Sequence, residues 1–158
     1  ARLIHERRPD VHFLLVGKGP YDVPLRQLAS ELALGDVFHF TGERDDVLDL
    51  FPLIDVFVMS SRWEAMPYAL LEAMGAARPI VLTHVSGLEK LVENGRAAAI
   101  IPPEDPEAIR RAVCDLLDDE PRRRALGRAA HDIATAKYTL RRSIREVERL
   151  YEEARHER

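Results

Sequence analysis

The sequence predicts an α/β fold in which helices cover both faces of a parallel sheet, followed by a C-terminal segment of helices alone. Three observations predict this fold. Short apolar runs without alternation recur through the first hundred or so residues, as is typical of strands buried on both faces. Helical periodicities separate these runs, and such alternation is typical of a parallel sheet. From Asp105 onward only helical periods remain.

A chain of 158 residues has the size of one domain. We divide it into an α/β part, residues 1–103, and a helical part, residues 104–158. The chain opens with a short helical pattern that Pro9 and Asp10 end. Because this pattern has no start signal, we expect the domain to be truncated at its N-terminus.

Five apolar runs are the predicted strands. They are residues 11–16, 37–40, 55–59, 79–82 and, more weakly, 97–101. Helices are predicted between them at 21–33, 45–51 and 68–77, and after them at 105–119, 121–136 and 139–155. Pro106 and Pro121 fall in first turns, where the missing N–H has no intrahelical partner to lose. The last helix carries Arg141, Arg145 and Arg149 among glutamates, which favours a solvated, salt-bridged face over a membrane-binding one.

The charge balance argues against a nucleic-acid-binding surface. Lys and Arg number 23 against 27 Asp and Glu, and the formal net charge of -4 is not that of a basic protein. No apolar run reaches the roughly 18 residues that cross a bilayer, and the first residues do not form a signal peptide. The single cysteine, Cys114, has apolar helical surroundings and is predicted to be a buried structural thiol. These features predict a protein of the reducing cytoplasm.

Metal and serine chemistry find little support in the sequence. The six histidines are scattered without metal-ligand spacing, and we expect no metal ion. Ser60 and Ser61 lack a nucleophile-elbow pattern, which argues against a serine hydrolase.

Ligands of an open parallel sheet bind beyond the carboxyl ends of its strands. The first predicted strand is followed by Gly17-Lys18-Gly19-Pro20, and the second by Thr41-Gly42-Glu43-Arg44. The glycines of the first turn allow close approach of a ligand, and Lys18 supplies a cation. A purely structural turn is an equally good interpretation.

The segment after the third predicted strand is more informative. Pro67 suits the first turn of a helix, which places Glu64 on the preceding loop and Glu72 in the helix. The free N–H groups at the start of that helix favour a diphosphate near residues 64–67. Glu72 has apolar neighbours, so its carboxylate needs a partner. That partner is either a ligand hydroxyl or a core arginine or backbone N–H, and the spacing alone does not separate the two.

These motifs, in this order, resemble the C-terminal domain of the family 4 (group 1) retaining glycosyltransferases. The matching segments are Val16–Pro20, Phe40–Gly42, Asp55–Ser61, Trp63–Glu64, Leu70–Met74, Pro79–Val81 and Pro102–Pro106. Glu64 and Glu72 match that family's E-x7-E motif. The resemblance implies the C-terminal half of a GT-B architecture, with two Rossmann-like domains. It also implies metal-independent transfer of a hexosyl group from a nucleoside-diphosphate sugar, with retention of configuration and no cofactor.

The resemblance further implies roles for individual residues. Glu64 is implied to be catalytic, with a hydrogen bond to the donor sugar, and Glu72 to bind the ribose hydroxyls. Gly17 is implied to lie near the diphosphate, and the backbone of Thr41 to Arg44 near the base. The full set implied to bind the donor is Gly17, Lys18, Gly19, Thr41, Gly42, Arg44, Ala65, Met66, Pro67, Tyr68, Leu71 and Glu72.

The sequence departs from the family pattern at two places. Ala65 follows the first glutamate, where glycine is usual. Ser86–Lys90 stands where Gly-Gly-x-Pro-Glu is usual, so a base replaces an acid. The family's first strand, the Arg and Lys that follow it, and the acceptor-binding domain are expected upstream of Ala1. Since that strand is central in the order 3-2-1-4-5-6, we expect a gap in the sheet, a chain prone to instability, and no transfer by the chain alone.

The leading hypothesis is the donor-binding half of a glycosyltransferase, whose partner is the N-terminal acceptor-binding domain of the same protein. One alternative is a non-catalytic nucleotide-binding or interaction module of the same fold. A third is a sugar-nucleotide epimerase of GT-B architecture. Any membrane association is expected only through the N-terminal half, at the cytoplasmic face.

Overall fold

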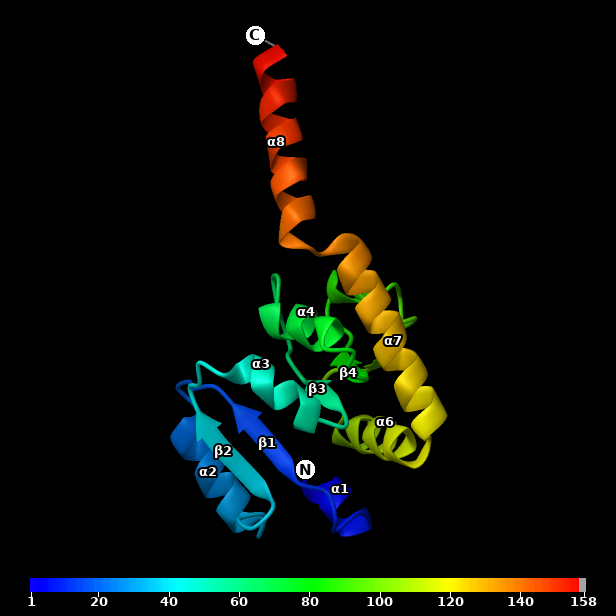
Figure 1. Cartoon of the computed structure of the whole chain (residues 1–158). Coiled ribbons are helices and arrows are strands. Elements are labelled where there is room, and N and C mark those ends of the chain that lie inside the picture. The colour runs from blue at the N-terminus through cyan, green and yellow to red at the C-terminus, as the bar shows by residue number, and fades with distance from the viewer. Residues whose placement is uncertain (157–158) are drawn as a thin grey trace.

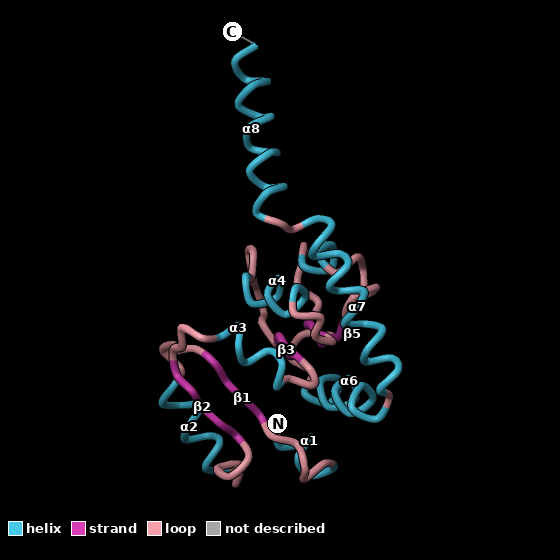
Figure 2. Tube along the Cα trace, viewed as in Figure 1, coloured by secondary structure: helices cyan, strands magenta, loops and turns pink. Residues whose placement is uncertain are grey.

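The computed structural model describes residues 1–156. Figures 1 and 2 show its elements. The strands are β1 (Phe13–Val16), β2 (Phe38–Gly42), β3 (Phe57–Met59), β4 (Ile80–Thr83) and β5 (Ala99–Ile101). The helices are α1 (Arg2–Arg7), α2 (Asp22–Glu31), α3 (Val47–Leu50), α4 (Tyr68–Gly75), α5 (Leu88–Leu91), α6 (Pro106–Asp118), α7 (Glu120–Lys137) and α8 (Leu140–His156), and a 3-10 helix, Phe51–Leu53, follows α3.

Every predicted strand and helix is present, with boundaries shifted by a few residues. α5 was not predicted, because four residues are too few to carry a helical period. Pro106 and Pro121 lie at helix starts as expected. The carboxylates of Asp105 and Asp119 cap these two helices, each accepting a hydrogen bond from the backbone N–H three residues on, at 2.8 and 2.9 Å.

The five strands form two parallel sheets instead of one. β1 pairs with β2, and β3, β4 and β5 pair in that order. Within residues 1–156, no backbone pairing joins β1 to β3. The gap expected for the order 3-2-1-4-5-6 without its first strand is therefore confirmed. Figure 1 shows β1, β2 and α2 together at one side of the molecule, with β3 and β4 beneath α4 and α7.

Burial on both faces holds for β4, whose four residues are all buried. The same prediction is wrong for β1, β2 and β3. Leu14 in the middle of β1 is 41% exposed, Val58 in the middle of β3 is 40% exposed, and His39 of β2 is exposed. β1 and β3 border the gap, where no neighbouring strand screens their side chains.

Two apolar clusters lie on opposite faces of β4. On one face Ile80 and Leu82 join Leu70 and Met74 of α4 and Ile133 of α7. On the other face Val81 joins residues of α1 and α6, among them Ile4, Val113 and Cys114. Helices therefore cover both faces of the three-stranded sheet. Cys114 is a free thiol that is 2% exposed, which confirms it as buried.

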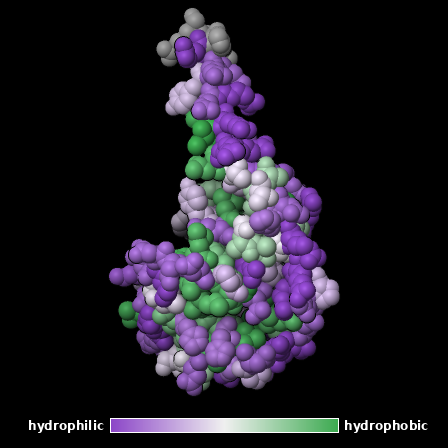
Figure 3. Space-filling view, in the orientation of Figure 1, coloured by the Kyte–Doolittle hydropathy of each residue, from purple (hydrophilic) through white to green (hydrophobic). Residues whose placement is uncertain are grey.

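α8 extends away from the rest of the chain (Figures 1 and 2). Its apolar and aromatic side chains are between 49% and 77% exposed, and Figure 3 shows green surface along the lower part of the helix. They are Leu140, Ile144, Val147, Leu150 and Tyr151. The predicted salt bridging is confirmed for Arg149, which pairs with Glu153 at 3.5 Å, and Arg142 pairs with Glu146 at 2.8 Å. Among the described residues, no helix has both the length and the apolar character that crossing a membrane requires.

Candidate functional site

The turn after β1 is joined directly to the end of β2. The N–H of Gly17 donates a hydrogen bond to the carbonyl of Gly42 at 2.8 Å. Both glycines have positive φ, 118° for Gly17 and 71° for Gly42, a region that other residues rarely adopt. The two predicted glycine turns are therefore neighbours, and both glycines are required by the backbone conformation itself.

The remaining residues of these turns lie at the surface. Lys18 and Gly19 are exposed, whereas Thr41 is half-buried and its hydroxyl lies 3.1 Å from the carbonyl oxygen of Gly42 and 3.3 Å from that of Leu15. Arg44 is exposed and forms a two-pronged ion pair with Asp46. That pair raises the pKa of Arg44 and lowers the pKa of Asp46, in both cases chiefly through the hydrogen bond between them. Arg44 is thus held by Asp46.

The loop after β3 carries the first glutamate of the E-x7-E motif. Pro67 is buried and is the N-cap of α4. The sequence placed Pro67 in the first turn, so the helix begins one residue later than predicted. Glu64 lies on the loop, as predicted, and is half-buried. The hydroxyl of Ser61 donates a hydrogen bond to Oε1 of Glu64 at 2.7 Å. The flanking Ala65 and Met66 are exposed.

Glu72 lies on α4, half-buried, as the sequence predicts. Within the described chain, no arginine, lysine or backbone N–H pairs with its carboxylate, and neither of its oxygens is sealed from solvent. Of the two kinds of partner considered for Glu72, the described chain therefore does not supply the core arginine or backbone N–H. No side chain caps the N-terminus of α4, where Tyr68 is exposed, and Leu71, the neighbour of Glu72, is half-buried. An uncapped helix start favours a negatively charged ligand.

The loop after β4 contributes residues that the sequence marked only as a departure. Lys90 is exposed on α5. Glu89 folds back so that the backbone N–H groups of Glu89 and Gly87 hydrogen-bond its carboxylate, which lowers its pKa. Its Oε2 is buried and has no partner among the described residues.

Sequence reasoning missed a second polar group beneath the loop after β3. Thr83, the last residue of β4, is 2% exposed. Its hydroxyl lies 2.5 Å from the carbonyl oxygen of Ser61 and 3.3 Å from that of Met59. A buried threonine at the end of a β-branched run looks like any other strand residue, so nothing in the sequence distinguishes it.

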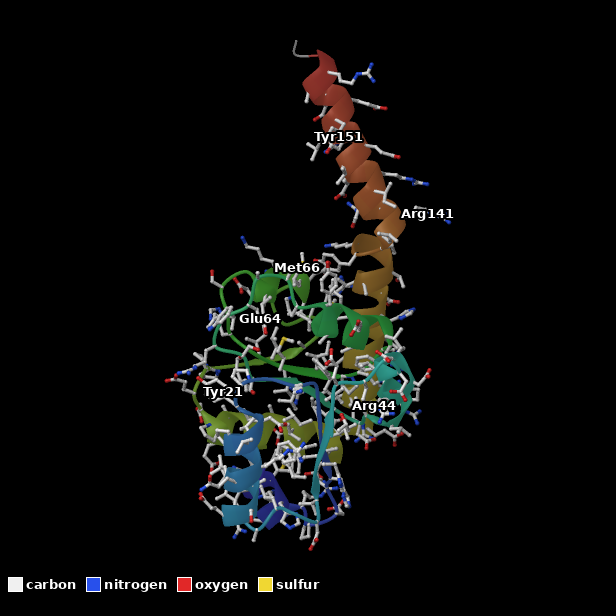
Figure 4. The ribbon with its side chains drawn as sticks, turned by 90° about the vertical axis from the view of Figure 1, so that its left-hand side faces the viewer. Tyr21, Arg44, Glu64, Met66, Arg141 and Tyr151 are labelled. Atoms are coloured by element: carbon white, nitrogen blue, oxygen red, sulfur yellow. The ribbon has the colours of Figure 1, made fainter. Side chains whose placement is uncertain are left out.

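Figure 4 shows how the two parts of the candidate site lie. Tyr21, which follows the Gly17–Pro20 turn, and Glu64 lie on the same side of the molecule, and Met66 lies above Glu64 near the start of α8. Within residues 1–156 there is no group of three or more His, Cys, Asp or Glu arranged to hold a metal ion.

A shallow cavity of about 300 Å³ lies between the loop after β3 and the start of α6. Ser60, Arg62, Thr83, Glu104 and Asp105 are among the residues that line it. None of the predicted donor-binding residues lines this cavity.

Comparison with known proteins finds one family pattern over most of the chain. A family model described as "Glycosyl transferases group 1" matches residues 1–119. Alpha-D-kanosaminyltransferase of Streptomyces kanamyceticus is 30% identical over 155 residues, which are 97% of this chain and 40% of that protein.

Solved structures agree with the fold. Sucrose-phosphate synthase from Thermosynechococcus elongatus matches 99% of this chain and 42% of its own, with a TM-score of 0.89 and 23% identity. HepE of Anabaena, solved in complex with UDP and glucose, matches 95% of this chain and 42% of its own, with a TM-score of 0.89 and 21% identity. The predicted Rossmann-like fold is confirmed. The chain spans about two fifths of the length of these proteins.

Proposed function

Because the family pattern covers residues 1–119, the chain belongs to the group 1 glycosyltransferases, and we propose that it is the donor-binding half of such an enzyme. The proposed reaction transfers a hexosyl group from a nucleoside-diphosphate sugar to an acceptor. We further propose that it retains the configuration of the transferred sugar and uses no metal ion.

The observation that carries the proposal is the placement of the two glutamates. Glu64 lies on the loop after β3 and Glu72 on the helix that follows, at the carboxyl end of a parallel strand, where ligands of such sheets bind. Glu72 presents a carboxylate without a partner in the described chain, which suits the hydroxyls of a ribose. The uncapped start of α4 lies between them and suits a phosphate.

The glycine turns support the same assignment. The backbone of Gly17 is exposed beside β2, and it sits where a diphosphate could approach without meeting a side chain. HepE, which has the same fold, was solved with UDP and glucose. A nucleoside-diphosphate sugar is therefore the proposed donor class for this chain.

The proposed partner is an acceptor-binding domain of the same protein. The relatives and neighbours named above are more than twice as long as this chain, so they contain a further part that it does not match. Transfer to an acceptor is assigned to the two parts together.

The test is calorimetry and product analysis on the full-length gene product. UDP, GDP and ADP, followed by UDP-glucose, UDP-N-acetylglucosamine and GDP-mannose, are titrated in turn, with EDTA present throughout. We expect one nucleoside diphosphate and a sugar derivative of it to bind, and the sugar derivative to be turned over slowly to free sugar or to glycoside. Proton NMR of the anomeric signal then reports retention or inversion.

Three results would change or remove the assignment. Binding without turnover of any donor would favour the non-catalytic module. Release of an epimerised sugar nucleotide would favour the epimerase. No binding of any nucleoside diphosphate would remove the proposal altogether.

A further inference from the structure

Among residues 1–156, Thr83 is the one polar or charged residue that is buried as a whole. It stands at the carboxyl end of β4, one position beyond the last residue that pairs with β3. Its hydroxyl reaches across to the neighbouring strand, 3.3 Å from the carbonyl of Met59 and 2.5 Å from that of Ser61. A hydroxyl has one hydrogen, and the shorter distance makes Ser61 its main acceptor.

The same residue, Ser61, holds the carboxylate of Glu64. The Ser61 hydroxyl donates to Oε1 of Glu64 at 2.7 Å. A short chain of hydrogen bonds therefore runs from the buried end of β4, through the backbone and side chain of Ser61, to Glu64.

The rest of this loop has little to fix it. Trp63 is 83% exposed and Met66 is 52% exposed. Arg62 pairs with Glu104 at 3.0 Å, but both side chains are more than two thirds exposed, at 74% and 68%. Exposed ion pairs of this kind contribute little, because solvent screens them. The buried link through Thr83 is thus the stronger restraint on the loop.

We propose that Thr83 and Ser61 are positioning residues that hold Glu64 where it meets the donor sugar. This inference rests on the proposed role of Glu64. A carboxylate that contacts a sugar must be placed to within about 0.5 Å, and a residue on an exposed loop keeps such a position only if groups behind it hold the loop. Thr83 does so from the core and Ser61 from the loop itself.

The test compares three variants of the full-length gene product. Thr83→Val keeps the shape of the side chain and removes the hydroxyl, Thr83→Ser keeps the hydroxyl, and Ser61→Ala removes the bond to Glu64. We expect Thr83→Val and Ser61→Ala to lower kcat by about three- to tenfold, the effect of one lost hydrogen bond. The affinity for the free nucleoside diphosphate stays unchanged, and Thr83→Ser recovers most of kcat.

Thr135→Val is the matched control. Its hydroxyl also donates to a backbone carbonyl, that of His131 at 2.8 Å, but it lies on α7, outside the proposed donor-binding set. It should leave kcat unchanged. Thermal unfolding of each variant shows whether Thr83→Val folds; if it does not, Ser61→Ala and Thr83→Ser carry the test.

The decisive measurement repeats Thr83→Val in a Glu64→Gln background. If Thr83 acts through Glu64, adding Thr83→Val to Glu64→Gln lowers kcat by less than a further twofold. The inference is overturned if Thr83→Val lowers kcat as much in the Glu64→Gln background as in the wild type, or if it weakens the affinity for the free nucleoside diphosphate. Either result means that Thr83 is only structural. If Glu64→Gln alone matches the wild type, the proposed function fails at that residue. If Glu64→Gln loses turnover while Thr83→Val and Ser61→Ala keep it, only the positioning role fails.

Discussion

A side-chain carbon added at Gly127 of α7 would overlap the carbonyl oxygen of Ala77 and lie 3.1 Å from its carbonyl carbon. α7 therefore touches the backbone of the turn after α4 directly. In the same contact Nδ1 of His131 lies 2.7 Å from the carbonyl oxygen of Gly75. This contact fixes α4, and with it Glu72, against the longest helix that the structure describes.

Gly127→Ala is expected to destabilise the protein. In a helix interior alanine is favoured over glycine by about 1 kcal/mol, but overpacking against backbone costs about 1–3 kcal/mol, so the net loss should be up to about 2 kcal/mol. Gly75→Ala is the control, since an added carbon there meets nothing within 4 Å and φ is not positive. Urea unfolding measures the stability of both variants. Equal stability of Gly127→Ala and wild type would show that the backbone around Ala77 moves away from the added carbon at little cost.

Glu72→Ala is expected to weaken both the donor and the free nucleoside diphosphate. The ribose hydroxyls are present in both ligands, and a hydrogen bond to a charged group is worth about 1.5–3 kcal/mol, or about ten- to a hundredfold in Kd. Calorimetry measures it, with Glu148→Ala on the exposed part of α8 as the control. If Glu72→Ala binds the nucleoside diphosphate with wild-type affinity, Glu72 does not bind the ribose and has a structural role instead.

Glu64→Ala should give the opposite pattern. The sugar contact is lost, so turnover and affinity for the intact donor fall, whereas the Kd of the free nucleoside diphosphate stays within about twofold. Parallel titrations with nucleoside diphosphate and sugar nucleotide separate the two. If both ligands weaken equally, Glu64 contacts the nucleotide part instead.

Glu93 is expected to make stability depend on pH. Its carboxylate, in the turn after α5, accepts Nζ of Lys137 at 2.6 Å and a guanidinium nitrogen of Arg96 at 2.6 Å. The hydrogen bond from Lys137, followed by that from Arg96, lowers the pKa of Glu93 below its ordinary value. A lowered pKa in the folded state means that this stabilisation is present above about pH 4.3, the unfolded pKa, and is lost as the pH falls through the folded pKa.

Glu93→Gln should therefore unfold at lower urea than wild type near neutral pH, and the difference should shrink as the pH falls below about 4.3. Glu152→Gln on exposed α8 serves as the control, since no ion pair holds Glu152 in the described chain. A difference that stays constant with pH would mean that the Glu93 pairs do not contribute to stability.

The sequence predicted the elements well because its signals are local. Ile80, Val81 and Leu82 all suit a buried strand, and Pro67 marks the start of α4 within one residue. The spacing of Glu64 and Glu72 placed one glutamate on a loop and the other on a helix, as the structure has them.

Other features depend on contacts between distant segments and could not be predicted. Leu14 and Val58 resemble core residues in sequence, and only the gap between their strands explains their exposure. Thr83 and Ser61 are 22 residues apart, so no short pattern reveals their hydrogen bond. The sequence placed Ser61 in the matching segment Asp55–Ser61 and argued against it as a nucleophile, but it did not reveal that the hydroxyl of Ser61 donates to the carboxylate of Glu64.

The division into two sheets has a consequence for coupling between ligand and protein. The Gly17 turn belongs to the β1–β2 sheet and the E-x7-E motif to the β3–β4–β5 sheet, and within residues 1–156 no strand pairing joins the two sheets. Their separation depends on packing of side chains such as Val11 and Phe13 against the cluster around α6. If the donor nucleotide contacts both the Gly17 turn and the E-x7-E motif, as proposed, it links the two sheets. At a hundred times its Kd, such a ligand raises the free energy of parting them by about 2.7 kcal/mol, provided that the parted form does not bind it.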